Sequence, residues 1–154
     1  MTNVAAWLMQ VDRVSRVAVG QLELIHIIAQ PDYIEVPKAP EYCKRVVVWN
    51  NKVIPVLDLS MLVNKTSAYY QNNAVAVALY VNGPEKQVQY GGIQLIDMPV
   101  LDTVSNDQKI VESELSVRWK AISVSGYRSK DREIIPILDV QKIFSPGIEA
   151  LAYQ

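Results

Sequence analysis

The chain has 154 residues, of which 50% are hydrophobic and 20% charged, and its formal net charge is −1. This composition supplies enough apolar surface for one folded core and excludes an intrinsically disordered chain. The near-neutral charge gives no electrostatic basis for binding nucleic acid or a membrane surface.

A single cysteine, Cys43, excludes an internal disulfide framework and fits a reducing compartment. The first residues lack the basic stretch of a signal peptide, and Gln10 and Asp12 interrupt their apolar run. No stretch approaches the roughly 18 apolar residues that a membrane-spanning helix requires. We therefore expect a soluble, cytoplasmic protein that does not bind membranes directly.

Short β-branched runs separated by turn residues are typical of an all-β domain. The first two predicted strands cover residues 7–11 and 14–19. Residues 20–28 (GQLELIHII) fit neither the strand period nor the helix period, so both structures remain open there. Prolines between residues 31 and 40 then indicate an extended, irregular connection.

The clearest local signal is RVVVWNNKVIPVLDL, residues 45–59. Asn50 and Asn51 separate two β-branched runs and predict a two-residue hairpin turn, because asparagine tolerates positive φ. Pro55 cannot donate a ladder hydrogen bond, so we expect its strand to lie at a sheet edge or to be bulged at that point.

The remaining elements are predicted with less specific signals. Gly91 and Gly92 predict a bulge within their strand. After the hairpin we expect a short helical turn at 60–63 and a polar surface connection at 65–73. Further strands are predicted at 74–81, 87–95, 119–125 and 133–140, and a helix is predicted at 104–115. The ordered region is expected to end at 141–144.

An internal repeat divides the chain. IPVLDL at residues 54–59 returns as IPILDV at 135–140, an offset of 81 residues, and an apolar pair ends both copies at 62–63 and 143–144. Six matching residues could arise by chance in β-rich sequence, but a mid-strand proline followed three residues later by aspartate favours duplication. Each half would be too small to be stable alone. We expect one domain of two β lobes, approximately residues 1–66 and 67–154, whose true boundaries could interleave.

The segment PEYCKRVVVWNNKVIPVLDL, residues 40–59, resembles the signature of CheW-like domains. Arg45 stands where that family has glycine, and Asn50-Asn51 stand where it has Arg-Gly. Upstream, His26 stands in place of a family glutamate. The positions that fit the signature are Pro40, Tyr42, Val46, Trp49, Val53, Ile54, Pro55, Val56, Asp58 and Leu59.

The resemblance implies an all-β fold of two pseudo-duplicated five-stranded SH3-like barrels, with one or two short helices and a hydrophobic groove between the barrels. It also implies a non-enzymatic adaptor that couples the cytoplasmic tip of a chemoreceptor to the regulatory domain of a CheA-type histidine kinase. An auxiliary adaptor of a twitching-motility pathway on type IV pili fits the departures from the signature. The protein-binding residues expected from the resemblance are Leu24, His26, Ile27, Arg45, Trp49 and Asn50.

The sequence contains few residues that could form a catalytic site. His26 is the only histidine and lacks a Ser-His-Asp or Cys-His spacing, so an interface or structural role is favoured. Cys43 has no obvious activating partner. Asp58 and Asp139 follow strands and precede predicted helical turns, where aspartate caps a helix. We expect no cofactor and no metal; the alternative is a small β-barrel enzyme or ligand-binding protein that shares the architecture.

Overall fold

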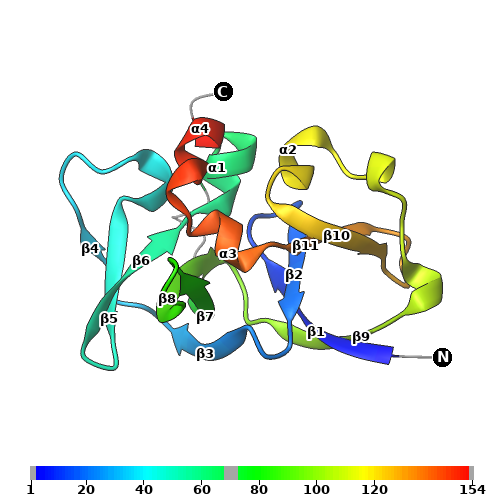
Figure 1. The fold of residues 1–154 in the computed structure, drawn as a ribbon, viewed down its shortest axis with the longest axis horizontal. Coiled ribbons are helices and arrows are strands. Elements are labelled where there is room, and N and C mark those ends of the chain that lie inside the picture. Colours follow the sequence, from blue (N-terminus) through cyan, green and yellow to red (C-terminus); the bar gives the residue numbers. More distant parts are fainter. Residues whose placement is uncertain (1–2, 68–72, 153–154) are drawn as a thin grey trace.

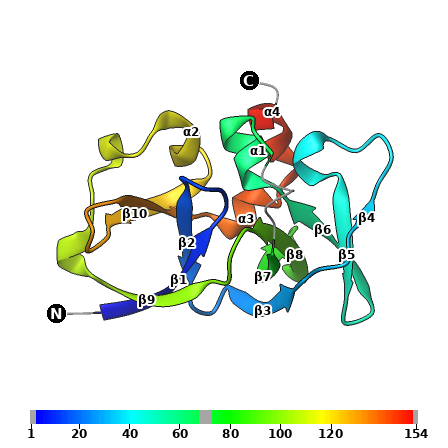
Figure 2. The same ribbon diagram turned by 180° about the vertical axis from the view of Figure 1, so that it is seen from behind.

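The computed structural model describes residues 3–67 and 73–152, and it shows two β lobes side by side with short helices above them (Figures 1 and 2). The all-β prediction is confirmed. The short α-helices are more numerous than the one or two expected: α1 (Leu59–Asn64), α2 (Val117–Lys120), α3 (Val140–Ile143) and α4 (Glu149–Ala152). Most of the expected polar connection at 65–73 lies outside the described residues.

Each lobe contains one sheet. Lobe A has the strand order β10-β11-β2-β1-β9, and lobe B has the order β3-β7-β8-β6-β5-β4. The strands of lobe A are β1 (Asn3–Gln10), β2 (Arg16–Gly20), β9 (Val100–Ser105), β10 (Ser123–Arg128) and β11 (Ile134–Leu138). Those of lobe B are β3 (Leu24–Ala29), β4 (Ile34–Glu35), β5 (Arg45–Trp49), β6 (Lys52–Leu57), β7 (Ala74–Asn82) and β8 (Gln87–Leu95).

The repeated motif occupies the same place in both lobes. Its strand, β6 or β11, pairs antiparallel with the strand before it and parallel with a strand of another hairpin. In lobe B Val56 lies opposite Gly92, and in lobe A Ile137 lies opposite Ala18. Val56 and Ile137 are separated by the same 81 residues as Pro55 and Pro136. The prolines therefore lie on equivalent strands, as the duplication predicts.

The two lobes differ in the order in which the chain forms their strands. Lobe B is built from β3 to β8 in sequence, whereas lobe A takes its first two strands from the start of the chain and its last three from the second half. Matching sheet positions pair β3 with β9, β5 with β10, β6 with β11, β7 with β1 and β8 with β2. Lobe A is thus a circular permutation of lobe B, and a division at residue 66 does not separate the sheets.

The largest core lies between the lobes. Strand β7 is buried on both faces: its alanines, including Ala76, face this central core, and Val75 and Val77 face a small core inside lobe B. In lobe A, Ala18 faces the lobe's own core and Val17 and Val19 face the central one. The helices complete the central core with Leu59, Leu62, Val63, Val140, Ile143 and Leu151. The middle of the interlobe region is therefore packed.

The predicted hairpin is present, with Trp49 opposite Lys52 and with φ of 51° at Asn50 and 59° at Asn51. The expectation that Pro55 lies at an edge or bulge is wrong, because β6 runs between β5 and β8 and pairs regularly with β5. Counting from the turn, Pro55 occupies a non-hydrogen-bonded position of that pair. Strand β8 meets β6 only at Val56 and Leu57, so the missing N–H removes no ladder bond.

The predicted helix at 104–115 is also wrong. This segment finishes β9 and then forms two 3₁₀ turns, Asn106–Gln108 and Glu112–Glu114. The side chain of Gln108 accepts the backbone N–H of Ser105 at 2.9 Å, which stabilises a turn where a helix was predicted. Trp119 belongs to α2 rather than to a strand, and order continues past residue 144 into α4.

Gly91 and Gly92 pair regularly with β7, so the expected bulge is absent. Gly91 instead makes room for Phe144: a Cβ there would lie 2.2 Å from the phenyl ring. That ring stacks on Tyr80, with 4.9 Å between ring centroids. The glycine therefore allows the end of α3 to pack on the β7–β8 hairpin.

We predict that Gly91→Val destabilises the protein by about 2 kcal/mol, since the new side chain displaces the Phe144 ring. Urea unfolding would measure the change. In Phe144→Ala the same substitution should cost much less, because the ring it displaces is gone. Equal costs in the two backgrounds would show that the ring is not the cause.

Asp12 links the lobes through the turn between β1 and β2. Its carboxylate accepts the backbone N–H groups of Val14 and Ser15 at 2.9 and 2.7 Å, and the side-chain amide of Asn64 in α1 at 3.0 Å. Burial opposes ionisation, but hydrogen bonds from Ser60, Val14, Ser15 and Asn64 together lower the pKa of Asp12. The ionised carboxylate is therefore stabilised by folding.

Asp12→Ala should lower the unfolding free energy by about 2 kcal/mol at pH 7. A lowered folded-state pKa means that this contribution is complete above the ordinary value of 3.8 and is lost as pH falls through the folded-state pKa. Denaturant curves for both proteins should therefore converge in strong acid. A difference that stays constant from pH 7 to pH 2 would contradict the assignment.

Candidate functional site

Three rings and one cation form a cluster at one end of lobe B, which we call the aromatic face: His26, Trp49, Lys52 and Tyr90. The rings of His26 and Trp49 lie 5.7 Å apart between centroids. Trp49 meets Tyr90 edge to face at 5.3 Å, and the Lys52 ammonium lies 5.1 Å from the centre of the Tyr90 ring. His26 and Lys52 are exposed, and Trp49 and Tyr90 are half-buried.

Local structure explains the arrangement. The two-residue turn places Trp49 and Lys52 opposite each other at the tip of the β5–β6 hairpin. Strand β3 is irregular between Leu24, which lies opposite Ala78, and His26, which lies opposite Val77. The extra residue, Ile25, lets Leu24 and Ile27 both pack on the central core while His26 points to the other face, beside Trp49.

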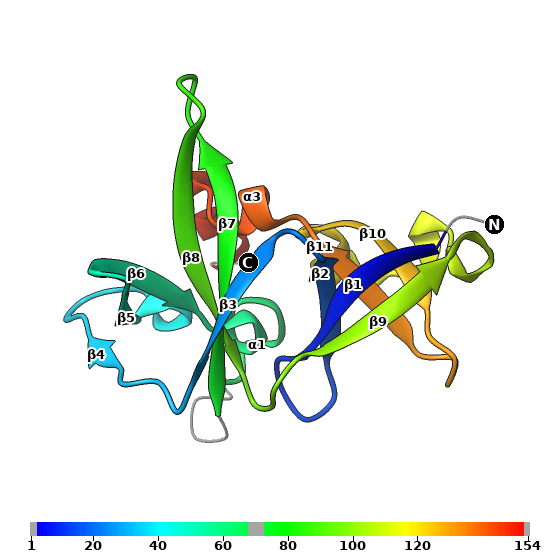
Figure 3. The same ribbon diagram turned by 90° about the horizontal axis from the view of Figure 1, so that it is seen from below.

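The β7–β8 hairpin extends the aromatic face outward. Figure 3 shows this hairpin projecting from the body of the protein. Leu79 lies opposite Tyr90, and beyond them Val81 lies opposite Val88, on the same side of the hairpin. Val88 is exposed, and Leu79 and Val81 are half-buried. An apolar surface therefore continues from the rings toward the hairpin tip.

The six expected binding residues separate into two groups. His26, Trp49 and Asn50 lie at the aromatic face or at its turn. Leu24 is 9% exposed and belongs to the central core, which corrects its expected place in an open groove. Ile27 is half-buried against the same core, and Arg45 lies at the opposite end of β5 from Trp49.

Sequence reasoning missed Tyr90 and Lys52. Lys52 had a usable signal, since it directly follows the Asn-Asn turn and must lie opposite Trp49. Tyr90 is brought in by the pairing of β8 with β6, and no local pattern marked that parallel contact.

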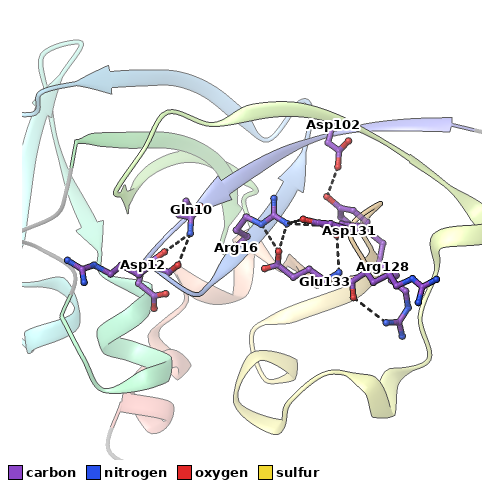
Figure 4. Close-up of polar contacts among 11 residues, drawn as sticks. Gln10, Asp12, Arg16, Asp102, Arg128, Asp131 and Glu133 are labelled. Carbon is purple, nitrogen blue, oxygen red and sulfur yellow. Dashed lines mark hydrogen bonds and ion pairs between the residues drawn. The ribbon is translucent and has the colours of Figure 1, made fainter.

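The equivalent end of lobe A has different chemistry. The alignment of the lobes places Arg16 at the position of Tyr90, Ser129 at that of Trp49 and Glu133 at that of Lys52. Arg16 donates from Nε to Glu133 at 2.8 Å and pairs with Asp131 at 3.3 Å (Figure 4). Ion pairs within the lobe occupy this end, whereas the equivalent positions of lobe B carry rings and a cation.

Exposed apolar residues also lie on or next to the two segments that join the lobes, between β2 and β3 and between β8 and β9. Trp7 anchors one of these segments by donating from its indole to the carbonyl of Gln21 at 3.2 Å, and Trp7 lies opposite Leu101 of β9. We call this surface the connector strip. Its members are between 40 and 87% exposed, and they are Leu22, Ile25, Met98, Val100 and Leu101.

The catalytic candidates have structural roles. Burial raises the pKa of the Cys43 thiol, which keeps it in the unreactive protonated form. Asp58 accepts the backbone N–H of Met61 and Asp139 that of Lys142, both at 3.1 Å, so both cap helices as predicted. Within residues 3–67 and 73–152, no group of three or more His, Cys, Asp or Glu residues could hold a metal ion. The described helices are also too short to cross a membrane.

The comparisons with known proteins agree with this architecture. The sequence model of the CheW-like domain family matches residues 12–146. The chain is similar to the crystal structure of the scaffolding protein TtCheW from Thermoanaerobacter tengcongensis, with a TM-score of 0.76 and 11% identity. That match covers 94% of this chain and 90% of the other. Comparison with curated proteins returns no match.

Proposed function

Because the chain belongs to the family of CheW-like domains, we propose that it is a non-enzymatic adaptor that couples a chemoreceptor to a CheA-type histidine kinase. The family match, which extends over residues 12–146, is the observation that carries this proposal. The structural roles of Cys43, Asp58 and Asp139 support a binding function over a catalytic one.

The aromatic face and the connector strip supply the surface for the receptor tip. A monomer rarely exposes a large contiguous apolar surface, and such a surface usually marks an interaction site. The apolar stripe of a helix would bury Leu22, Met98 and Leu101 while its end reaches Trp49. The kinase would bind elsewhere, which leaves both partners bound at once.

The proposal is tested by mixing the purified chain with the receptor tip and the kinase regulatory domain from the same organism. We expect each partner to bind at micromolar concentrations and a three-component complex to form in size-exclusion chromatography. Kinase autophosphorylation should then respond to the receptor only when the chain is present. An adaptor that binds neither partner at about 100 μM would contradict the proposed function.

Asn50 should weaken the binding of this chain to receptors that other members of the family recognise. Asn50→Arg places a planar cation in the turn, where it can pair with partner carboxylates. We expect a gain of about threefold to tenfold in affinity for such a receptor tip by calorimetry. Asn106→Arg, an exposed substitution in lobe A, adds the same charge and should change nothing. Equal gains in both variants would reflect net charge instead of the turn.

A further inference from the structure

We propose that the segment which binds the aromatic face carries carboxylates beside its apolar side chains. The inference rests on the proposed function and adds the chemistry of the partner. It follows from the charges that the aromatic face contains and from the charges that it lacks.

The aromatic face contains a cation and no acid. Lys52 lies over the Tyr90 ring, and its ammonium takes part in none of the ion pairs found among the described residues. Glu23, which precedes β3, already accepts the backbone N–H of Gly20 at 2.9 Å. The tip of the β7–β8 hairpin carries one acidic residue, Glu85, and one basic residue, Lys86. A partner that buries Lys52 must therefore supply the compensating carboxylate.

At the equivalent end of lobe A, the cation is paired with acidic residues of the same lobe. There Arg16 is met by Glu133 and Asp131 of its own lobe, so its charge is satisfied without a partner. Lobe B has Lys52 at the position of Glu133 and Tyr90 at that of Arg16. The same architecture thus closes one end with internal ion pairs and leaves the other with an uncompensated cation over an aromatic ring.

His26 adds a polar ring to this surface. The elements packed around it are β7, which places Val77 opposite, the β5–β6 hairpin, which contributes Trp49 and Lys52, and β8, which contributes Tyr90. None of these groups is a carboxylate. An imidazole N–H can donate a hydrogen bond to a carboxylate, so a partner carboxylate beside Lys52 would also find a donor in His26.

The test measures binding of the receptor tip from the same organism by calorimetry. Lys52→Glu should weaken binding at least tenfold, and Lys52→Gln by less. Lys142→Glu changes an exposed lysine of α3 by the same charge and should have little effect.

Thermal melts should first establish that each variant is folded. The inference is overturned if Lys52→Glu binds as well as wild type or better, which would indicate a neutral or basic partner segment. It is overturned equally if Lys142→Glu weakens binding as much as Lys52→Glu does, which would reflect net charge instead of this surface. A wild-type chain that binds neither receptor nor kinase contradicts the proposed function itself, and the two failures are therefore distinguishable.

Discussion

Leu24→Asp is expected to unfold the protein instead of weakening a binding site. Leu24 is 9% exposed and packs in the central core that joins both lobes. The substitution removes apolar contacts that are worth about 2 to 5 kcal/mol and leaves a carboxylate without a partner. A total of about 4 to 6 kcal/mol would approach the whole stability of many domains of this size.

Ile25→Asp is the matched control, because the neighbouring residue lies at the irregularity of β3 and is exposed. It should change the unfolding free energy by no more than about 0.5 kcal/mol. Circular dichroism during urea unfolding would measure both variants. If Leu24→Asp folds with near-normal stability, the placement of Leu24 in the central core is wrong.

The second large effect is expected at Trp49. Its ring contacts both His26 and Tyr90 at the centre of the aromatic face, where tryptophan contributes most to protein binding. Trp49→Ala should weaken binding of the receptor tip by about 2 to 3 kcal/mol, or roughly 30- to 150-fold. Trp49→Phe keeps a ring and should recover part of that loss.

Val48→Ala is the control for Trp49, since Val48 is exposed on the opposite face of the same strand. It should leave the affinity unchanged. Isothermal calorimetry with the receptor tip would measure all three variants, and a melt would separate lost binding from lost folding. Unchanged affinity in Trp49→Ala would move the interaction site away from the aromatic face.

The sequence was most informative where local geometry alone determines structure. Asn50 and Asn51 predicted the hairpin because positive φ is a property of the turn itself. The repeat around Pro55 and Pro136 predicted two lobes, because equivalent strands keep the same residues. The repeat could not predict the circular permutation, because a repeated motif does not specify which strands pair with it.

The errors arose where contacts distant in sequence decide the structure. Residues 20–28 matched no period because Ile25 is an extra residue, which places Leu24 and Ile27 on one face. Gly91 suggested a bulge, but its small size is needed because the Phe144 ring, which is distant in sequence, packs against it. At the candidate site, His26, Trp49 and Asn50 were expected as binding residues from the resemblance, and they stay a prediction. Tyr90 needed the register of β6 and β8, which no local pattern specifies.

The permuted order of lobe A has a consequence for synthesis on the ribosome. All strands of lobe B have been made once residue 95 has emerged, whereas β2 must wait for β11 before lobe A can close. Arg16 and Glu133, which meet at that closure, are 117 residues apart. Lobe B can therefore fold first and serve as a template, while β1 and β2 remain exposed to chaperones and proteases until translation is nearly complete.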